Sequence, residues 1–150
     1  MTDKIDTLID GFAFDAWANR QWWEYIQNKS LDDPDRTIFA HMLAAQKIWS
    51  LRVEGAPPSS MPIVVPSLEN ILELNQEWIT HLKARSDDPL IHYKRLDGTP
   101  QHLRLGQIAR HVIDHGTYHR GELRGLCRAR NSEDFPETGL ALYYLTRGEG

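Results

Sequence analysis

The chain has 150 residues, of which 41 % are hydrophobic and 25 % charged, and its formal net charge is −4. This size and composition predict one globular domain over residues 1–150 with a substantial hydrophobic core. The negative charge argues against a nucleic-acid partner, since phosphate binding needs clustered Lys and Arg. The single cysteine, Cys127, excludes an internal disulfide framework and favours a cytoplasmic location. No signal peptide and no membrane-length apolar run is apparent, so we expect no membrane association.

The spacing of apolar residues predicts a mostly helical chain. Long helices are expected over 3–28, from 34 to about 54, over 67–86 and from about 103 to 130, with a short helix over 138–145. Pro34 is suited to a helix start, Gly55 to a helix end, and Ser67 with Asn70 to a helix cap. Four long helices with one apolar stripe each predict an all-α four-helix bundle.

Two of the segments between the predicted long helices have sequence patterns that predict their structure. The proline-rich stretch 55–66 predicts a loop that cannot be helical. Residues 91–105 alternate around Asp97-Gly98 and predict a short β-hairpin before the last long helix, with Pro100 weakening its second arm.

Histidines recur every four residues on the last long helix, at His111, His115 and His119. The apolar stripe Leu105, Ile108, Val112 continues through His115 and His119 to Leu123 and Leu126, so those two histidines take core positions, whereas His111 lies on the flank. Buried imidazoles need partners, and a pair at i and i+4 can reach one metal ion.

The second long helix offers a third ligand. Its stripe is Ile38, His41, Ala45, Ile48 and Trp49, with Arg52 at the end, so His41 again takes a core position beside the small Ala45. In a bundle, ligands from facing helices converge in the interior. Three histidines with one open coordination position are typical of a catalytic metal site. His81, His92 and His102 are interpreted as surface or hairpin residues, and Cys127 as a small packing residue.

The sequence lacks the other common metal-binding, nucleotide-binding and hydrolase motifs. HVIDH over 111–115 has Asp114 where the inverted metalloprotease motif needs Glu, and there is no HExxH, no paired Glu-x-x-His, no nucleotide-binding glycine loop and no GxSxG elbow.

Several segments in order resemble the DinB / YfiT-like family of helical-bundle metalloproteins. They are FDAWANRQWWEYI (14–26), HMLAAQKIWSLRVEG (41–55), residues 93–98, HVIDHGTYHRGEL (111–123) and the tail ALYYL (141–145). The most specific is the HxxxHRG element at 115–121, and together the segments cover nearly the whole chain.

The resemblance implies a bundle of four helices, commonly a homodimer, that holds one divalent ion, zinc or nickel, through His41, His115 and His119. It leaves His111 outside the ligand set. Some relatives are S-transferases or isomerases that use a low-molecular-weight thiol such as bacillithiol, mycothiol or glutathione. Gln46 stands where many relatives carry an acidic residue.

Three functions follow as alternatives. The first is a metal-dependent enzyme, a thiol S-transferase or a hydrolase, acting on a small-molecule substrate in a pocket that includes Trp49. In it, Arg52 and Arg120 orient an anionic group, although Arg120 equally fits a buried ion pair. The second is a non-enzymatic stress-response module that binds metal. The third is a metal-free helical interaction module. The substrate and the ion are not encoded in any motif of the sequence.

Overall fold

The computed structural model describes residues 3–57 and 65–147, which contain five helices and one two-stranded sheet. The long helices are α1 (Asp3–Ile26), α2 (Pro34–Val53), α3 (Leu68–Ala84) and α4 (Leu105–Ala129). The strands β1 (Leu90–Lys94) and β2 (Pro100–Arg104) precede α4, and the short α5 (Leu140–Thr146) follows it. The prediction of a mostly helical chain with a β-hairpin before the last long helix is therefore confirmed. None of the helices in the described residues combines the length and apolar character needed to cross a bilayer.

Local signals in the sequence account for the helix starts. At α2, the carboxylate of Asp33 accepts a hydrogen bond from the backbone N–H of Asp35, and Pro34 is the first helical residue. At α3, the hydroxyl of Ser67 accepts from the backbone N–H of Asn70, as expected. Part of the predicted loop 55–66, residues 58–64, lies outside the described residues.

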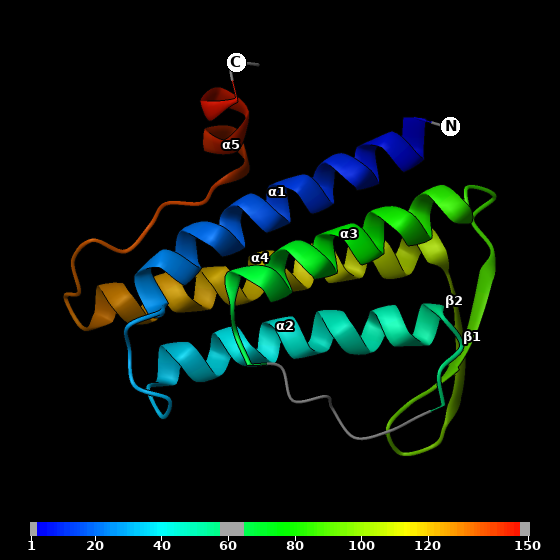
Figure 1. The fold of residues 1–150 in the computed structure, drawn as a ribbon, viewed down its shortest axis with the longest axis horizontal. Coiled ribbons are helices and arrows are strands. Elements are labelled where there is room, and N and C mark those ends of the chain that lie inside the picture. Colours follow the sequence, from blue (N-terminus) through cyan, green and yellow to red (C-terminus); the bar gives the residue numbers. More distant parts are fainter. Residues whose placement is uncertain (1–2, 58–64, 148–150) are drawn as a thin grey trace.

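The four long helices run side by side, and α1 and α2 each pack against both α3 and α4 (Figure 1). The hairpin lies at the end of the helices where α2 finishes and α4 begins, and β1 packs against α2. The helix α5 packs on α1, where the ring of Tyr143 meets that of Phe14 at 5.7 Å. Because α2 and α4 are neighbours, histidines on the two helices can approach each other.

The hairpin turns where the sequence predicts it. Gly98 has a φ of +87°, a conformation that glycine adopts without strain, and its N–H donates to the carbonyl of Arg95. Pro100 is the first residue of β2 and pairs with Lys94, so it begins the second arm without breaking it.

The buried side chains of the described residues form two large apolar clusters, one toward each end of the long helices, and a small one of Phe14, Ala18 and Tyr143 where α5 packs on α1. The cluster near the hairpin contains Phe12, Trp78 and Ile108, and the cluster at the other end contains Trp22, Phe39 and Leu123. Phe12 and Trp78 stack with ring centroids 5.0 Å apart. The two large clusters are separated along α1, α2 and α4 by buried polar side chains.

An ion pair lies at the centre of this polar layer. The guanidinium of Arg120 donates from NH1 to Asp15 Oδ1 and to Asn19 Oδ1, both at 2.7 Å, and Gln46 also hydrogen-bonds Asp15. Burial raises the pKa of the Asp15 carboxyl, and the Arg120 guanidinium opposes this shift. Gly116 is required here, because a Cβ at this position would lie 2.5 Å from Asp15 Oδ1.

The predicted core position of His41 is wrong. Ala45 and Ile48 of the predicted stripe are buried, but His41 is exposed and Ile38 and Trp49 are only partly buried. The buried face of α2 is broader than the predicted stripe and includes the polar Gln46 and Ser50, which an apolar pattern cannot detect.

Two further burial predictions are wrong. His81 is only 4 % exposed, because the stripe of α3 continues from Trp78 to His81 and Leu82 and the ring finds a partner in Ser50. On α4, Leu126 is 37 % exposed while Cys127 is fully buried, because the stripe advances four residues rather than three after Leu123. His92 and His102 are exposed on the hairpin, as predicted.

Candidate metal centre

Two histidines of α4 form the base of the candidate centre. His115 and His119 are one helical turn apart, so both rings leave the same side of α4. Their Nε2 atoms lie 3.1 Å apart and their ring centroids 4.4 Å apart. Both side chains are partly buried, which corrects the expectation of full core positions.

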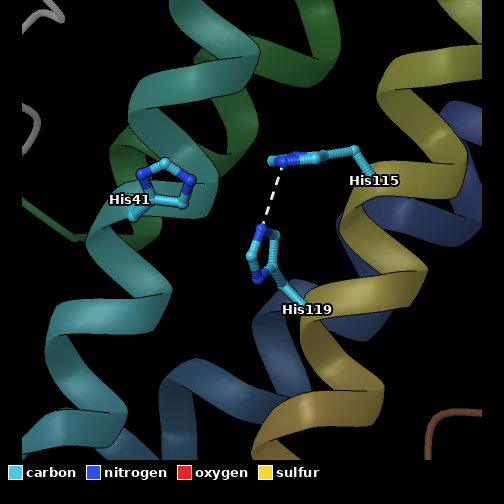
Figure 2. Close-up of side chains that lie close together, drawn as sticks. All are labelled: His41, His115 and His119. Atoms are coloured by element: carbon cyan, nitrogen blue, oxygen red, sulfur yellow. Dashed lines mark hydrogen bonds between the residues drawn. The ribbon is translucent and has the colours of Figure 1, made fainter.

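The third histidine comes from α2. The ring of His41 points from α2 toward the two rings of α4 (Figure 2), with its centroid 5.9 Å from that of His115 and 5.2 Å from that of His119. One ring nitrogen from each histidine lies within 4.8 Å of the other two. The histidines therefore converge between α2 and α4 at a place where His41 is exposed to solvent, rather than in the interior of the bundle.

The spacing of the nitrogens can be compared with that of a metal site. Two imidazole nitrogens that bind one tetrahedral ion at 2.0–2.1 Å lie roughly 3.4 Å apart. The α4 pair at 3.1 Å already has nearly this separation. The 4.8 Å limit that includes His41 is longer, so ion binding requires the His41 ring to move toward α4. An exposed side chain on a helix surface has the freedom for this movement.

The protonation of His115 favours metal binding. Burial, together with the smaller effects of the neighbouring His119, His111 and His41 in that order, lowers the pKa of the His115 ring from its ordinary 6.5 to about 4. At neutral pH the ring is neutral and has one nitrogen lone pair, which is the form that binds a metal ion.

Glu122 sets the orientation of His119, a role that the sequence analysis missed. Its Oε1 lies 2.9 Å from His119 Nδ1. Since a carboxylate only accepts hydrogen bonds, Nδ1 holds the proton and Nε2 faces His115 with a lone pair. A carboxylate bonded to the far nitrogen of a histidine is the usual support of a metal ligand. The signal was present in the sequence, because Glu122 follows His119 by three residues and i,i+3 neighbours meet on a helix.

Three other predicted site residues lie beside the cluster. His111 is exposed and is not part of the metal-compatible group, but its ring lies 5.7 Å from that of His115. The ring of Trp49 lies 5.4 Å from that of His111, and the guanidinium of Arg52 lies 4.4 Å from the Trp49 ring. A continuous row of aromatic and cationic groups thus leads from the cluster to the hairpin end of α2.

Of the two roles predicted for Arg120, the structure shows the buried ion pair. Arg120 is 3 % exposed, and its guanidinium donates to Asp15, Asn19 and Thr117 within the protein. Gln46, which the resemblance identified as a departure near the metal, bonds Asp15 in the same buried layer.

A cavity of about 680 Å³ lies on another side of α4, between α1 and the start of α5, and includes Gly11, Ile113 and Tyr144. None of the three clustered histidines lines it. The histidine cluster and this cavity therefore lie on different sides of α4.

When the chain is compared with known proteins, no family model, no curated protein and no solved structure matches it. The resemblance to the DinB / YfiT-like family stays a prediction from the sequence segments quoted above.

Proposed function

We propose that this protein is a four-helix bundle of the DinB / YfiT-like kind that binds one divalent ion, zinc or nickel, through His41, His115 and His119. The proposal extends to a metal-dependent transferase or hydrolase reaction on a small molecule. The observation that carries it is the convergence of three imidazoles from two helices, with ring nitrogens within 4.8 Å of one another. The neutral state of His115 and the Glu122 carboxylate behind His119 support the same conclusion.

Three protein ligands leave a coordination position for a reactant. A divalent ion at such a site lowers the pKa of a water or a low-molecular-weight thiol, which supplies a nucleophile at neutral pH. The chain's own residues hold the ligand nitrogens in place, and the rings of Trp49 and His111 form one wall beside them. The exposure of His41 gives a reactant access from solvent.

Metal content is the first test. The chelator-treated protein is reloaded with Zn²⁺ or Ni²⁺, freed of excess ion, and analysed by elemental mass spectrometry. We expect about one ion per chain, lost in His115→Ala and retained in the matched control His111→Ala, which changes an exposed histidine one turn away. Absence of bound ion in the unaltered protein would contradict the proposal and favour the metal-free interaction module. The oligomeric state, expected to be a homodimer, is measured by light scattering on the same samples.

Turnover is the second test. The loaded and metal-free proteins are assayed for conjugation of a model electrophile to glutathione, bacillithiol and mycothiol, and for ester hydrolysis. We expect at least one reaction to depend on the ion and on His41. Stoichiometric metal binding with no turnover in any assay would overturn the enzymatic part and favour a non-enzymatic metal-binding module.

A further inference from the structure

A cleft of about 570 Å³ lies between the end of α2 and the hairpin. Its lining includes Trp49 and Arg52 from α2, Tyr93 from β1, and Arg95, Leu96, Asp97 and Gln101 from the hairpin turn and β2. The cleft contains two guanidinium groups and one carboxylate, so its net charge is positive. The overall charge of the protein is −4, which makes a positive cleft a local feature rather than a consequence of composition.

Arg52 is held in this cleft by aromatic rings. Its guanidinium carbon lies 4.4 Å from the centroid of the Trp49 ring and 4.9 Å from that of the Tyr93 ring, and the two rings contact each other at 5.1 Å. Stacking on the face of a guanidinium leaves its in-plane N–H donors free. The two rings therefore hold Arg52 by the face of its guanidinium and leave its fork of donors available to a ligand.

In the part of the chain that the structure describes, no carboxylate pairs with Arg52. Over residues 3–57 and 65–147, no ion pair and no side-chain hydrogen bond is made by its guanidinium. Partial burial lowers its pKa, and only the Tyr93 hydroxyl acts in the opposite direction. A fixed, partly desolvated guanidinium without a partner is suited to bind an oxyanion, because two parallel N–H donors match a carboxylate or a phosphate.

The cleft is also connected to the histidine cluster. Trp49, which stacks on Arg52, contacts His111, and His111 contacts His115. Trp49 follows His41 by eight residues on α2, which corresponds to roughly 12 Å along the helix. One elongated molecule can therefore place an oxyanion at Arg52 and its other end at the histidines.

We propose that the cleft between α2 and the hairpin binds the anionic end of the substrate, an elongated organic molecule whose carboxylate or phosphate is held by Arg52. This inference rests on the proposed function, since the histidine cluster is taken as the reacting centre. Arg95 adds a second positive charge at the mouth of the cleft.

The first experiment uses metal-free protein, so its result does not depend on metal binding. Benzoate, phenyl phosphate and the uncharged benzamide are titrated while the indole N–H signals are followed by ¹H–¹⁵N NMR, with the Trp49 signal assigned from Trp49→Phe. We expect the two anions to shift the Trp49 signal and benzamide to leave it unchanged. The comparison of the two anions distinguishes a carboxylate from a phosphate ligand.

Variants then identify the anchor. Arg52→Gln is expected to weaken binding of the preferred anion by about tenfold or more, since hydrogen bonds between charged groups contribute strongly. Arg52→Lys keeps the charge without the flat fork and should bind with intermediate affinity. The matched control, Arg20→Gln, changes an exposed arginine of α1 and should bind like the unaltered protein. The proposal would be overturned if Arg52→Gln bound the anion as tightly as the unaltered protein does, or if the anions and benzamide bound equally well. If Arg52→Gln does not fold, a folded Arg52→Lys that binds no anion would overturn it as well.

A second experiment tests the link to the histidines. An eight-carbon hydroxamic acid that ends in a carboxylate is compared with the same chain ending in a methyl group, on zinc-loaded protein. We expect the carboxylate to increase affinity about tenfold, and Arg52→Gln to remove this gain. If the first experiment shows anion binding at Arg52 but the terminal carboxylate does not increase the affinity here, Arg52 still binds anions, and the proposed link between this cleft and the metal centre is overturned. If the protein takes up no zinc, the proposed function fails while anion binding at Arg52 is judged by the first experiment alone.

Discussion

One carboxylate outside the histidine cluster sets the direction in which His119 presents its lone pair. The 2.9 Å contact from Glu122 to Nδ1 leaves Nε2 as the nitrogen that faces His115. Without it, the ring could hold its proton on either nitrogen, and part of the population would turn an N–H rather than a lone pair toward the proposed metal site. Glu122 is therefore a positioning residue that acts through His119.

Glu122→Gln tests this role. The amide can still accept a hydrogen bond, but it lacks the charge that favours a proton on Nδ1, so we expect Zn²⁺ affinity to fall by about 10–100-fold. Competition with a fluorescent zinc chelator measures the change. Glu73→Gln on the exposed face of α3 is the control and should leave the affinity unchanged. Equal affinities in both variants would show that Glu122 is an ordinary surface residue.

The candidate ligands could be predicted from the sequence because helical spacing alone brings His115 and His119 to one side of α4. Their environment could not, because it depends on how far α2 is rotated about its own axis. The buried face of α2 includes Gln46 and Ser50, which hydrogen-bond Asp15, His81 and Glu77 on other helices. An apolar pattern contains no information on such distant polar partners.

At the scale of elements, α1 and α4 are joined at their middle by a close approach that only glycine permits. A Cβ at position 116 would lie 2.5 Å from Asp15 Oδ1 and 3.0 Å from Arg120 NH1. The buried ion pair therefore occupies the space that a side chain would need. Because position 116 directly follows His115, this contact also fixes the helix that carries two of the three proposed metal ligands.

Gly116→Ala is expected to destabilise the protein by about 3 kcal/mol, because the Asp15–Arg120 pair must separate while both charges remain buried. Gly121→Ala is the matched control on the same helix, since a Cβ there meets no atom within 4 Å. Alanine favours helix more than glycine does, so this variant should be stabilised by up to about 1 kcal/mol. Urea denaturation measures both values. A neutral Gly116→Ala would mean that the ion pair tolerates separation.

The contact between α2 and α3 contains a buried histidine with a defined proton. Ser50 donates its hydroxyl proton to Glu77 Oε1, so the Nε2–H of His81, at 2.8 Å, donates to the Ser50 oxygen. The Nδ1 atom accepts from Arg85 at 3.4 Å. Burial lowers the pKa of His81 from its ordinary 6.5, and the charge of Arg85 lowers it further.

This lowered pKa predicts a pH dependence of stability. Below pH 6.5 the unfolded chain takes up a proton at His81 that the folded chain refuses, so the free energy of unfolding falls as the pH decreases toward the folded pKa. Urea denaturation of metal-free protein between about pH 7.5 and 5 should show this loss. His81→Gln, which can still donate and accept, should decrease the slope by up to about 1.4 kcal/mol per pH unit. Identical slopes in both proteins would contradict the assignment.

At the scale of the whole molecule, the sequence predicts the elements better than their mutual arrangement. The start of α2 at Pro34 and the turn at Gly98 depend on residues within one short segment, so local patterns suffice. The approach of His41 to His115 joins segments more than seventy residues apart, and it depends on α2 packing beside α4. The histidine positions on the two helices and the expectation of a bundle suggested that approach, and the family resemblance implied the same three ligands.

An ion shared by α2 and α4 would act as a crosslink between them, and this gives a test on the intact protein. A ligand present at 100 times its dissociation constant stabilises the folded state by about 2.7 kcal/mol. For a chain of this size, we expect Zn²⁺ to raise the melting temperature by about 5–10 °C. His41→Ala keeps both α4 histidines and should lose most of this rise, whereas His92→Ala, on the exposed hairpin, should retain it. If the rise persists in His41→Ala, the pair on α4 binds the ion without α2, and the crosslink does not exist.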